Sequence, residues 1–172
     1  MSIELPEQSP CEICESLTGR DRRHTIIEEG VHTFITMSPW QFEIGQCLVV
    51  TRRHVGTLLD LTDDETREIA INAKRTAHAL NAAFHPLGIL TFQNNGVYSG
   101  QSVPHFHFHV VPRQPGSDWG IGPPQLARID SAGRAAGFVH DSSTDEARYE
   151  RAQVDEESLQ RTAALIRAHL PR

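Results

Sequence analysis

Three histidines at alternate positions mark the part of this chain that could do chemistry. His105, His107 and His109 are separated by single phenylalanines in the stretch SVPHFHFHVVPR, residues 102–113. Alternate side chains of a β-strand point to opposite faces, so the imidazoles are expected on one face and the phenylalanines in the core. Such a face suits a solvated sheet surface, a metal site or a site for an anionic substrate.

The loop before the histidines favours an anionic substrate. Gly96 and Gly100, in the stretch QNNGVYSGQS, allow a sharp turn and a close approach of backbone to a ligand. Asn94, Gln101 and Ser102 supply uncharged hydrogen-bond donors. An ordinary hairpin loop has a similar composition, but next to the histidines the loop is suited to phosphate oxygens.

The cysteines point to a reducing compartment. The chain has three, of which Cys11 and Cys14 form the pair CEIC. This number and spacing fit a cytoplasmic protein with reduced thiols better than a disulfide framework. The CEIC pair could supply metal ligands, whereas Cys47 is expected to be a small core residue.

These residues need a sheet to position them, and the sequence predicts five strands. Alternating or continuous apolar runs bounded by glycine, proline or asparagine are typical of strands. They occur at residues 24–29, 31–37, 46–54, 88–95 and 104–111. The first two are expected to form a hairpin around a tight turn at Glu29–Gly30.

Two helices are predicted. The better one begins at Thr62, where Glu65 three residues on completes a capping box, and it ends before Pro86. Its apolar face is Ile69, Ala73, Ala77, Leu80 and Phe84. A C-terminal helix within residues 155–170 has the stripe Leu159, Ala163, Ile166 and Leu170. Between the two, residues 114–154 lack periodicity and are either an excursion over the surface or disordered.

Composition fits a single domain with its own core. The chain has 172 residues, 38% of them hydrophobic and 22% charged, with a formal net charge of −6. This charge gives no general attraction to nucleic acid or to an anionic membrane, so neither is expected as a partner. No segment resembles a secretory signal or a membrane span, and we expect a cytoplasmic protein.

The stretch GQSVPHFHFHVV closely resembles the signature of the histidine triad family of nucleotide hydrolases and transferases. The resemblance runs in order from CEIC to Arg113. It implies the α+β fold of that family, an antiparallel sheet of about five strands with one long helix, and a homodimer. We divide the chain into residues 1–113, the family domain with a metal-binding N-terminal lead, and residues 114–172, an extension whose helix packs on the same domain.

The resemblance also implies a mechanism. His107 would attack the α-phosphorus of a nucleoside phosphoramidate or dinucleoside polyphosphate, and water would cleave the resulting nucleotidyl-histidine. The implied catalytic residues are His107, His109, Gln101 and Ser102. The implied substrate-binding residues are Asn94, Gly100, Gln101, Ser102 and His109. A neutral nucleophile is available at pH 7 because an unperturbed imidazole has a pKa of about 6.5.

In relatives with a Cys-x-x-Cys pair, the first histidine of the triad binds zinc rather than substrate. The resemblance carries this set onto Cys11, Cys14, His54 and His105 of this chain. Two thiolates and two imidazoles suit tetrahedral zinc, and four protein ligands leave no open position. The implied zinc is therefore structural.

Some positions depart from the family pattern. Thr36 stands where many relatives carry an acidic or amide side chain that holds the ribose, and Gln46 replaces a frequent histidine. We interpret both departures as affecting nucleoside recognition and not phosphoryl chemistry. Two alternatives to a hydrolase stay open: a nucleotidyl transferase or phosphorylase that uses the same histidine, and a nucleotide-binding module with little turnover.

Overall fold

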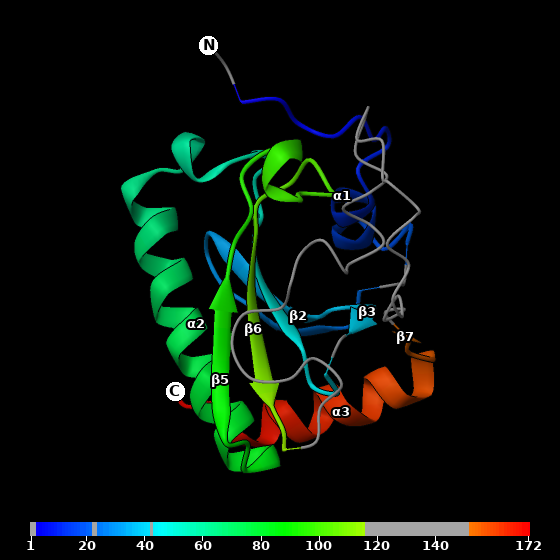
Figure 1. Cartoon of the computed structure of the whole chain (residues 1–172), viewed down its shortest axis with the longest axis vertical. Coiled ribbons are helices and arrows are strands. Elements are labelled where there is room, and N and C mark those ends of the chain that lie inside the picture. Colours follow the sequence, from blue (N-terminus) through cyan, green and yellow to red (C-terminus); the bar gives the residue numbers. More distant parts are fainter. Residues whose placement is uncertain (1–2, 22–23, 42, 116–151) are drawn as a thin grey trace, which may run out of the picture.

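A computed structural model describes residues 3–21, 24–41, 43–115 and 152–172. Its centre is a five-stranded antiparallel sheet with strand order β1-β2-β4-β6-β5 (Figure 1). The strands are β1 Ile26–Glu29, β2 Thr33–Met37, β4 Cys47–Thr51, β5 Gly88–Phe92 and β6 His107–Arg113. The predicted α+β class and antiparallel sheet are confirmed, whereas the homodimer stays a prediction.

The remaining elements surround this sheet. The helices are α1 Glu12–Leu17, α2 Asp63–Phe84 and α3 Glu156–His169, with 3-10 turns η1 Leu58–Asp60 and η2 Val97–Ser99. A second, two-stranded sheet pairs β3 Trp40–Gln41 with β7 Ala152–Gln153. Among the described residues, no helix is both long and apolar enough to cross a membrane. Most of the predicted excursion 114–154, residues 116–151, lies outside the described part of the chain.

The last strand of the sheet begins later than its sequence pattern predicts. His105 was expected inside a strand, but β6 begins at His107, which pairs with Val50 of β4. The reason is local: Pro104 has no N–H for a ladder, and the His105 N–H donates within a tight turn to Val103 O at 2.8 Å. The three histidines therefore do not form one ladder.

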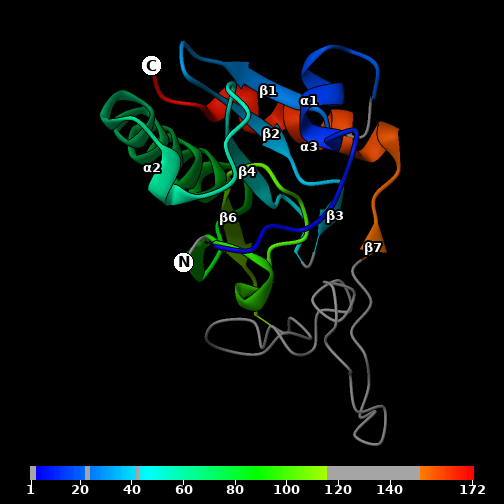
Figure 2. The same cartoon turned by 90° about the horizontal axis from the view of Figure 1, so that it is seen from above.

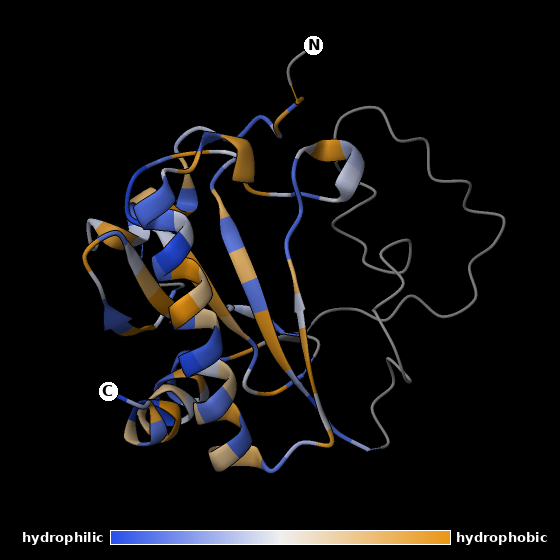
Figure 3. Ribbon diagram, turned by 90° about the vertical axis from the view of Figure 1, so that its left-hand side faces the viewer, coloured by the Kyte–Doolittle hydropathy of each residue, from blue (hydrophilic) through white to orange (hydrophobic). Residues whose placement is uncertain are grey.

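Helices α2 and α3 cover one face of the sheet, and their apolar residues form the main core with it (Figures 1 and 2). Hydrophobic and hydrophilic residues alternate along the helices (Figure 3), as amphipathic packing requires. All five residues of the predicted α2 face belong to this core, and Phe108 and Val110 of β6 enter it together with Phe106, which immediately precedes the strand. From α3, the predicted stripe contributes Leu159, Ala163, Ile166 and Leu170.

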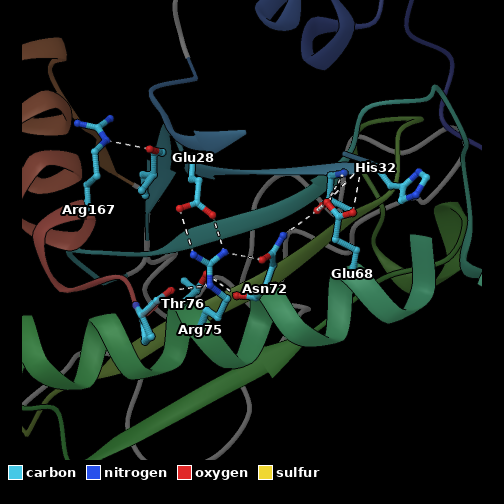
Figure 4. Close-up of polar contacts among 10 residues, drawn as sticks. Glu28, His32, Glu68, Asn72, Arg75, Thr76 and Arg167 are labelled. Atoms are coloured by element: carbon cyan, nitrogen blue, oxygen red, sulfur yellow. Dashed lines mark hydrogen bonds and ion pairs between the residues drawn. The ribbon is translucent and has the colours of Figure 1, made fainter. Parts of the chain in front are cut away.

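Polar side chains of α2 fix the β1–β2 hairpin (Figure 4). The Glu68 carboxylate accepts from the Thr33 N–H at 2.9 Å, from the Thr33 hydroxyl at 2.8 Å and from the His32 N–H. Two turns further on, Arg75 pairs with Glu28 of β1. The Glu68 contacts satisfy donors at the start of β2, and the Arg75 pair joins α2 to β1.

The opposite face of the sheet carries the histidines. Ile13 of α1 packs there against Phe34, Leu48 and Val50 in a smaller apolar cluster. In the β4–β6 ladder, Leu48 lies opposite His109 and Val50 opposite His107. Because residues opposite each other share a face, the histidines project from the side that α2 and α3 leave uncovered.

The capping box at the start of α2 is present as predicted and has an additional partner. Thr62 and Glu65 exchange side-chain and backbone hydrogen bonds. The Glu65 carboxylate also binds the Arg53 guanidinium through two bonds of 3.0 and 2.8 Å. Glu65 is 4% exposed, and the bond from Arg53 lowers the pKa of its carboxyl to about 2. The pair ties the chain just before His54 to the helix.

This pair predicts a specific acid sensitivity. The folded-state pKa of Glu65 lies below the unfolded value of about 4.3, so its contribution is complete above that value and is lost as the pH falls toward 2. We expect Glu65→Gln to lower the free energy of unfolding at pH 7 by about 1–3 kcal/mol, with the difference shrinking between pH 5 and 2. Urea unfolding across this range measures the effect. Glu157→Gln, which breaks the exposed pair with Arg161, is the control and should cost much less; equal costs would contradict the prediction.

Candidate functional site

The three histidines belong to two separate groups on the same face of the sheet. His105, which precedes β6, is completely buried. His107 and His109 lie within β6, are each 8% exposed, and have their rings in an edge-to-face arrangement with centroids 5.0 Å apart. This low exposure excludes the solvated sheet surface that a simple alternation of polar and apolar residues allows.

His105 belongs to a cluster of four potential metal ligands. The Cys14 Sγ lies 3.3 Å from His54 Nδ1 and 3.5 Å from His105 Nδ1, and Cys11 Sγ lies 3.6 Å from His105 Nδ1. All four ligand atoms are within 4.8 Å of one another. The cluster joins residues around the start of α1, the segment after β4 and the segment before β6. The structure therefore brings together the four residues that the sequence selected.

The donor set fits a tetrahedral cation. Metal–sulfur bonds of about 2.3 Å and metal–nitrogen bonds of about 2.0 Å place tetrahedral ligands roughly 3.3–3.8 Å apart, and the three sulfur–nitrogen distances given above lie in this range. His105 Nε2 lies 2.8 Å from the Thr51 carbonyl oxygen. Because a carbonyl only accepts, Nε2 carries the proton and the Nδ1 lone pair is directed at the cysteines.

The protonation state of His105 suits a metal ligand, whereas that of Cys14 does not. Burial lowers the pKa of His105 to about 4, so its ring is neutral at pH 7. Burial and the neighbouring Cys11 raise the pKa of the Cys14 thiol to about 11. A cation that bound here would have to displace this thiol proton, since the thiolate is the ligand.

His107 is oriented by a backbone carbonyl. Its Nδ1 donates to the His105 carbonyl oxygen at 2.7 Å. As a neutral imidazole carries one proton, Nε2 keeps a lone pair. The ring can therefore act as a nucleophile or base through Nε2.

His109 has two neighbours that the sequence did not place beside it. The Phe92 ring of β5 stacks on it, with centroids 4.2 Å apart and planes 8° from parallel. The Gln46 amide Nε2 lies 3.1 Å from His109 Nδ1. The interpretation that Gln46 affects nucleoside recognition stays a prediction, and the structure adds that Gln46 contacts the histidine implied in phosphoryl chemistry. The sequence offered one signal for this position, the departure of Gln46 from the family pattern. It did not show the strand register that brings Gln46 to His109.

The loop from Asn94 to Ser102 lies before this strand and contains residues of different exposure. Asn94 is half-buried, Ser102 is exposed, and Gly100 has φ +85°, a conformation that favours glycine. Gln101 is 1% exposed. Its amide accepts from Gly96 N–H at 2.6 Å and donates to the carbonyls of Gly56 and Val103 at 2.8 and 2.9 Å. These bonds hold the loop, so a direct role of Gln101 on a leaving group would require it to leave them.

Two further sequence interpretations concern neighbours of the site. Thr36 is completely buried, and its hydroxyl donates to the Thr25 carbonyl at 2.9 Å. Cys47 is also completely buried in the main core, as expected. Trp119, which from the sequence either packs on the surface or caps the site of the same or the partner chain, lies outside the described residues.

Comparison with known proteins agrees with this geometry. A family model described as HIT domain matches residues 22–116. Protein hit of Bacillus subtilis is 30% identical over 103 residues, 60% of this chain and 70% of that protein. The adenosine 5'-monophosphoramidase of Schizosaccharomyces pombe is 31% identical over 78 residues, 45% of this chain and 55% of its own length. The bifunctional bis(5'-adenosyl)-triphosphatase/adenylylsulfatase of Arabidopsis thaliana is 40% identical over 70 residues, 40% of this chain and 38% of its own.

Solved structures show the same fold. A Hit-like protein from Bartonella henselae superposes with a TM-score of 0.72 at 21% identity, covering 96% of this chain and 99% of that one. A zinc-bound histidine triad family protein from Mycobacterium smegmatis superposes with a TM-score of 0.65 at 24% identity, covering 94% and 93%.

The fold and the site define a small α+β protein that presents paired imidazoles from the strand next to its sheet edge, beside a Cys/His cluster. The chain belongs to the HIT domain family, whose model spans more than half of its length.

The bonds of Gln101 predict a stability effect. Gln101→Leu keeps the approximate volume but leaves the Gly96 N–H and two carbonyls without their partner, so we expect the free energy of unfolding to fall by about 2–3 kcal/mol. Ser102→Ala, one residue away and exposed, should change it by less than about 0.5 kcal/mol. Chemical denaturation of both variants measures this difference, and equal stabilities would show that the Gln101 bonds contribute nothing.

Proposed function

We propose that this protein is a hydrolase that cleaves nucleoside phosphoramidates or dinucleoside polyphosphates at the α-phosphate through a covalent nucleotidyl-histidine. The observation that carries the proposal is the bond from His107 Nδ1 to the His105 carbonyl, which places the ring proton on Nδ1 and the lone pair on Nε2. The printed activities of two relatives, a monophosphoramidase and a bis(5'-adenosyl)-triphosphatase, support the substrate class.

In the proposed reaction, His107 Nε2 attacks the α-phosphorus, and the bond from phosphorus to the leaving group breaks as the N–P bond forms. Water then attacks the same phosphorus, breaks the N–P bond and releases the nucleoside monophosphate. Splitting the displacement in this way gives two steps with lower barriers than one. The adjacent His109 binds a phosphoryl oxygen and stabilises the charge that builds there.

The loop before β6 supplies the remaining proposed contacts. The exposed Ser102 hydroxyl donates to the leaving group or the bridging atom, and Asn94 holds another part of the phosphate chain. Gly100 permits the close approach of the loop to the phosphates. Gln101 supports these residues through its backbone bonds and reaches the substrate only if those bonds open.

We also propose that the cation held by Cys11, Cys14, His54 and His105 is zinc. The S₂N₂ donor set and the ligand spacing support this assignment. With four protein ligands the ion has no open position, so its role is structural: it joins α1 to the segment before β6. None of the three cysteines forms a disulfide, which suits the proposed cytoplasmic location, and we propose a homodimer as the functional state.

The nucleophile assignment predicts the phenotype of His107→Asn. We expect the release of nucleoside monophosphate from an adenosine phosphoramidate and from diadenosine polyphosphates to fall at least roughly 10³-fold, because no other group replaces the attacking nitrogen. His78→Asn, an exposed histidine on α2, is the matched control and should keep wild-type activity. Full activity of His107→Asn would refute the assignment.

Orthophosphate and a binding measurement separate the alternatives. A phosphorylase would form nucleoside diphosphate when orthophosphate is added to the wild type, whereas a hydrolase would not. A binding module would bind nucleotide with little turnover of any of these substrates.

The metal assignment predicts zinc stoichiometry. The purified protein, prepared with reduced cysteines and without chelator, should contain about one zinc per chain. Cys14→Ser should lose most of the zinc and unfold at a lower temperature, because metal binding contributes to folding free energy. Cys47→Ala changes a cysteine outside the cluster and should keep the zinc. Only trace metal in the wild type would count against the four-ligand site.

A further inference from the structure

Gln46 occupies a position from which it can control His109. It immediately precedes β4, and the ladder places Leu48 opposite His109 and Cys47 opposite Val110. Since side chains alternate along the strand, Gln46 and Leu48 share the face that carries the histidines. Gln46 is completely buried, so bulk water cannot replace its amide bonds.

The chemistry of the contact fixes the location of a proton. The amide Nε2 of glutamine only donates, so the His109 Nδ1 that lies 3.1 Å away accepts with its lone pair. A neutral imidazole carries one ring proton, and in His109 this proton must then be on Nε2. The Phe92 ring, stacked at 4.2 Å, holds the plane of the imidazole and so the direction of that N–H.

We infer that Gln46 is a positioning residue that holds His109 in the Nε2–H tautomer, so that the two neighbouring histidines of β6 carry opposite tautomers. His107 is protonated on Nδ1 by its bond to the His105 carbonyl and presents a lone pair. His109 presents an N–H beside it. One face of the strand thus offers a nucleophile and a hydrogen-bond donor as separate neutral groups.

The catalytic consequence of these opposite tautomers rests on the proposed function. A phosphoryl group attacked by His107 develops negative charge on its oxygens, which needs a donor nearby. If the His109 proton were on Nδ1, the Nε2 lone pairs of both rings would face the substrate, and the anion would meet repulsion instead of a hydrogen bond. The tautomer of His109 therefore affects the rate of the chemical step more than binding.

The tautomers can be measured directly by ¹⁵N NMR of the histidine rings in the zinc-loaded protein, at a pH where both rings are neutral. A His109→Asn variant assigns the His109 signals. We expect the His109 proton on Nε2 and the His107 proton on Nδ1 in the wild type. Gln46→Glu replaces the amide donor with a carboxylate that only accepts and should move the His109 proton to Nδ1.

Gln46→Met removes the donor with little change in volume and should leave His109 in a mixture of tautomers. Under the proposed activity, kcat should fall about fivefold to tenfold with KM nearly unchanged, less than the loss expected for removing a whole donor. Asn72→Leu is the matched control: this amide is 5% exposed and bonds to Thr33 and Arg75 on the α2 side of the sheet. It should lower stability while leaving the His109 tautomer and kcat unchanged.

Two results would overturn the inference. A proton on His109 Nδ1 in the wild type would mean that the Gln46 amide oxygen faces the ring and accepts from it. An unchanged His109 tautomer in both Gln46 variants would mean that another contact fixes it. The NMR measurement needs no substrate and the wild-type protein suffices for its first part, so it decides the inference even if nucleotide turnover, and with it the proposed function, fails.

Discussion

The carbonyl of His105 accepts a hydrogen bond from His107 Nδ1 at 2.7 Å, and the organisation of the site depends on this contact. On one side, the His105 ring is held between the Thr51 carbonyl and the two cysteines. On the other, its backbone fixes the tautomer of His107. The Cys/His cluster and the paired imidazoles are therefore mechanically linked through a single residue, and whatever orders His105 also orders His107.

The sheet makes this link possible because one of its faces packs in the main core and the other carries the histidines. Phe106 and Val110 are completely buried beneath α2 and α3, which holds β6 in position from one side. The histidines on the other face can then be buried among polar partners without supporting the main core. A histidine at a fixed place on a packed strand loses little further entropy when it acts, which is the benefit of placing a site on a rigid element.

Polar pairs outside the site control the loops that reach it. Arg53 binds Glu65 at the start of α2 immediately before His54 enters the cluster. The Gln101 amide joins the loop at Gly96 to the backbone at Gly56. In each interaction the carboxylate or amide is buried, so its bonds stabilise one loop conformation over its alternatives.

The sequence by itself determined the elements and the choice of most site residues. The period-two pattern placed Phe106, Phe108 and Val110 in the core, the Thr62–Glu65 box marked the start of α2, and the CEIC pair together with the histidine signature selected the cluster. The first two signals are local, because capping and side-chain alternation depend on neighbours a few residues apart. The choice of the cluster, which spans Cys11 to His105, came from the resemblance to the family.

Only the tertiary structure decided which residues contact the site residues. It placed His105 outside the strand, engaged Gln101 with backbone, stacked Phe92 on His109, and brought Gln46 to His109 across 63 residues of sequence. Such contacts depend on strand register and on which strands are neighbours, and a shift of one residue would turn Gln46 to the other face. Local patterns therefore indicate which side chains share a face, but the packed sheet decides which of them touch, and so which nitrogen of each histidine carries its proton.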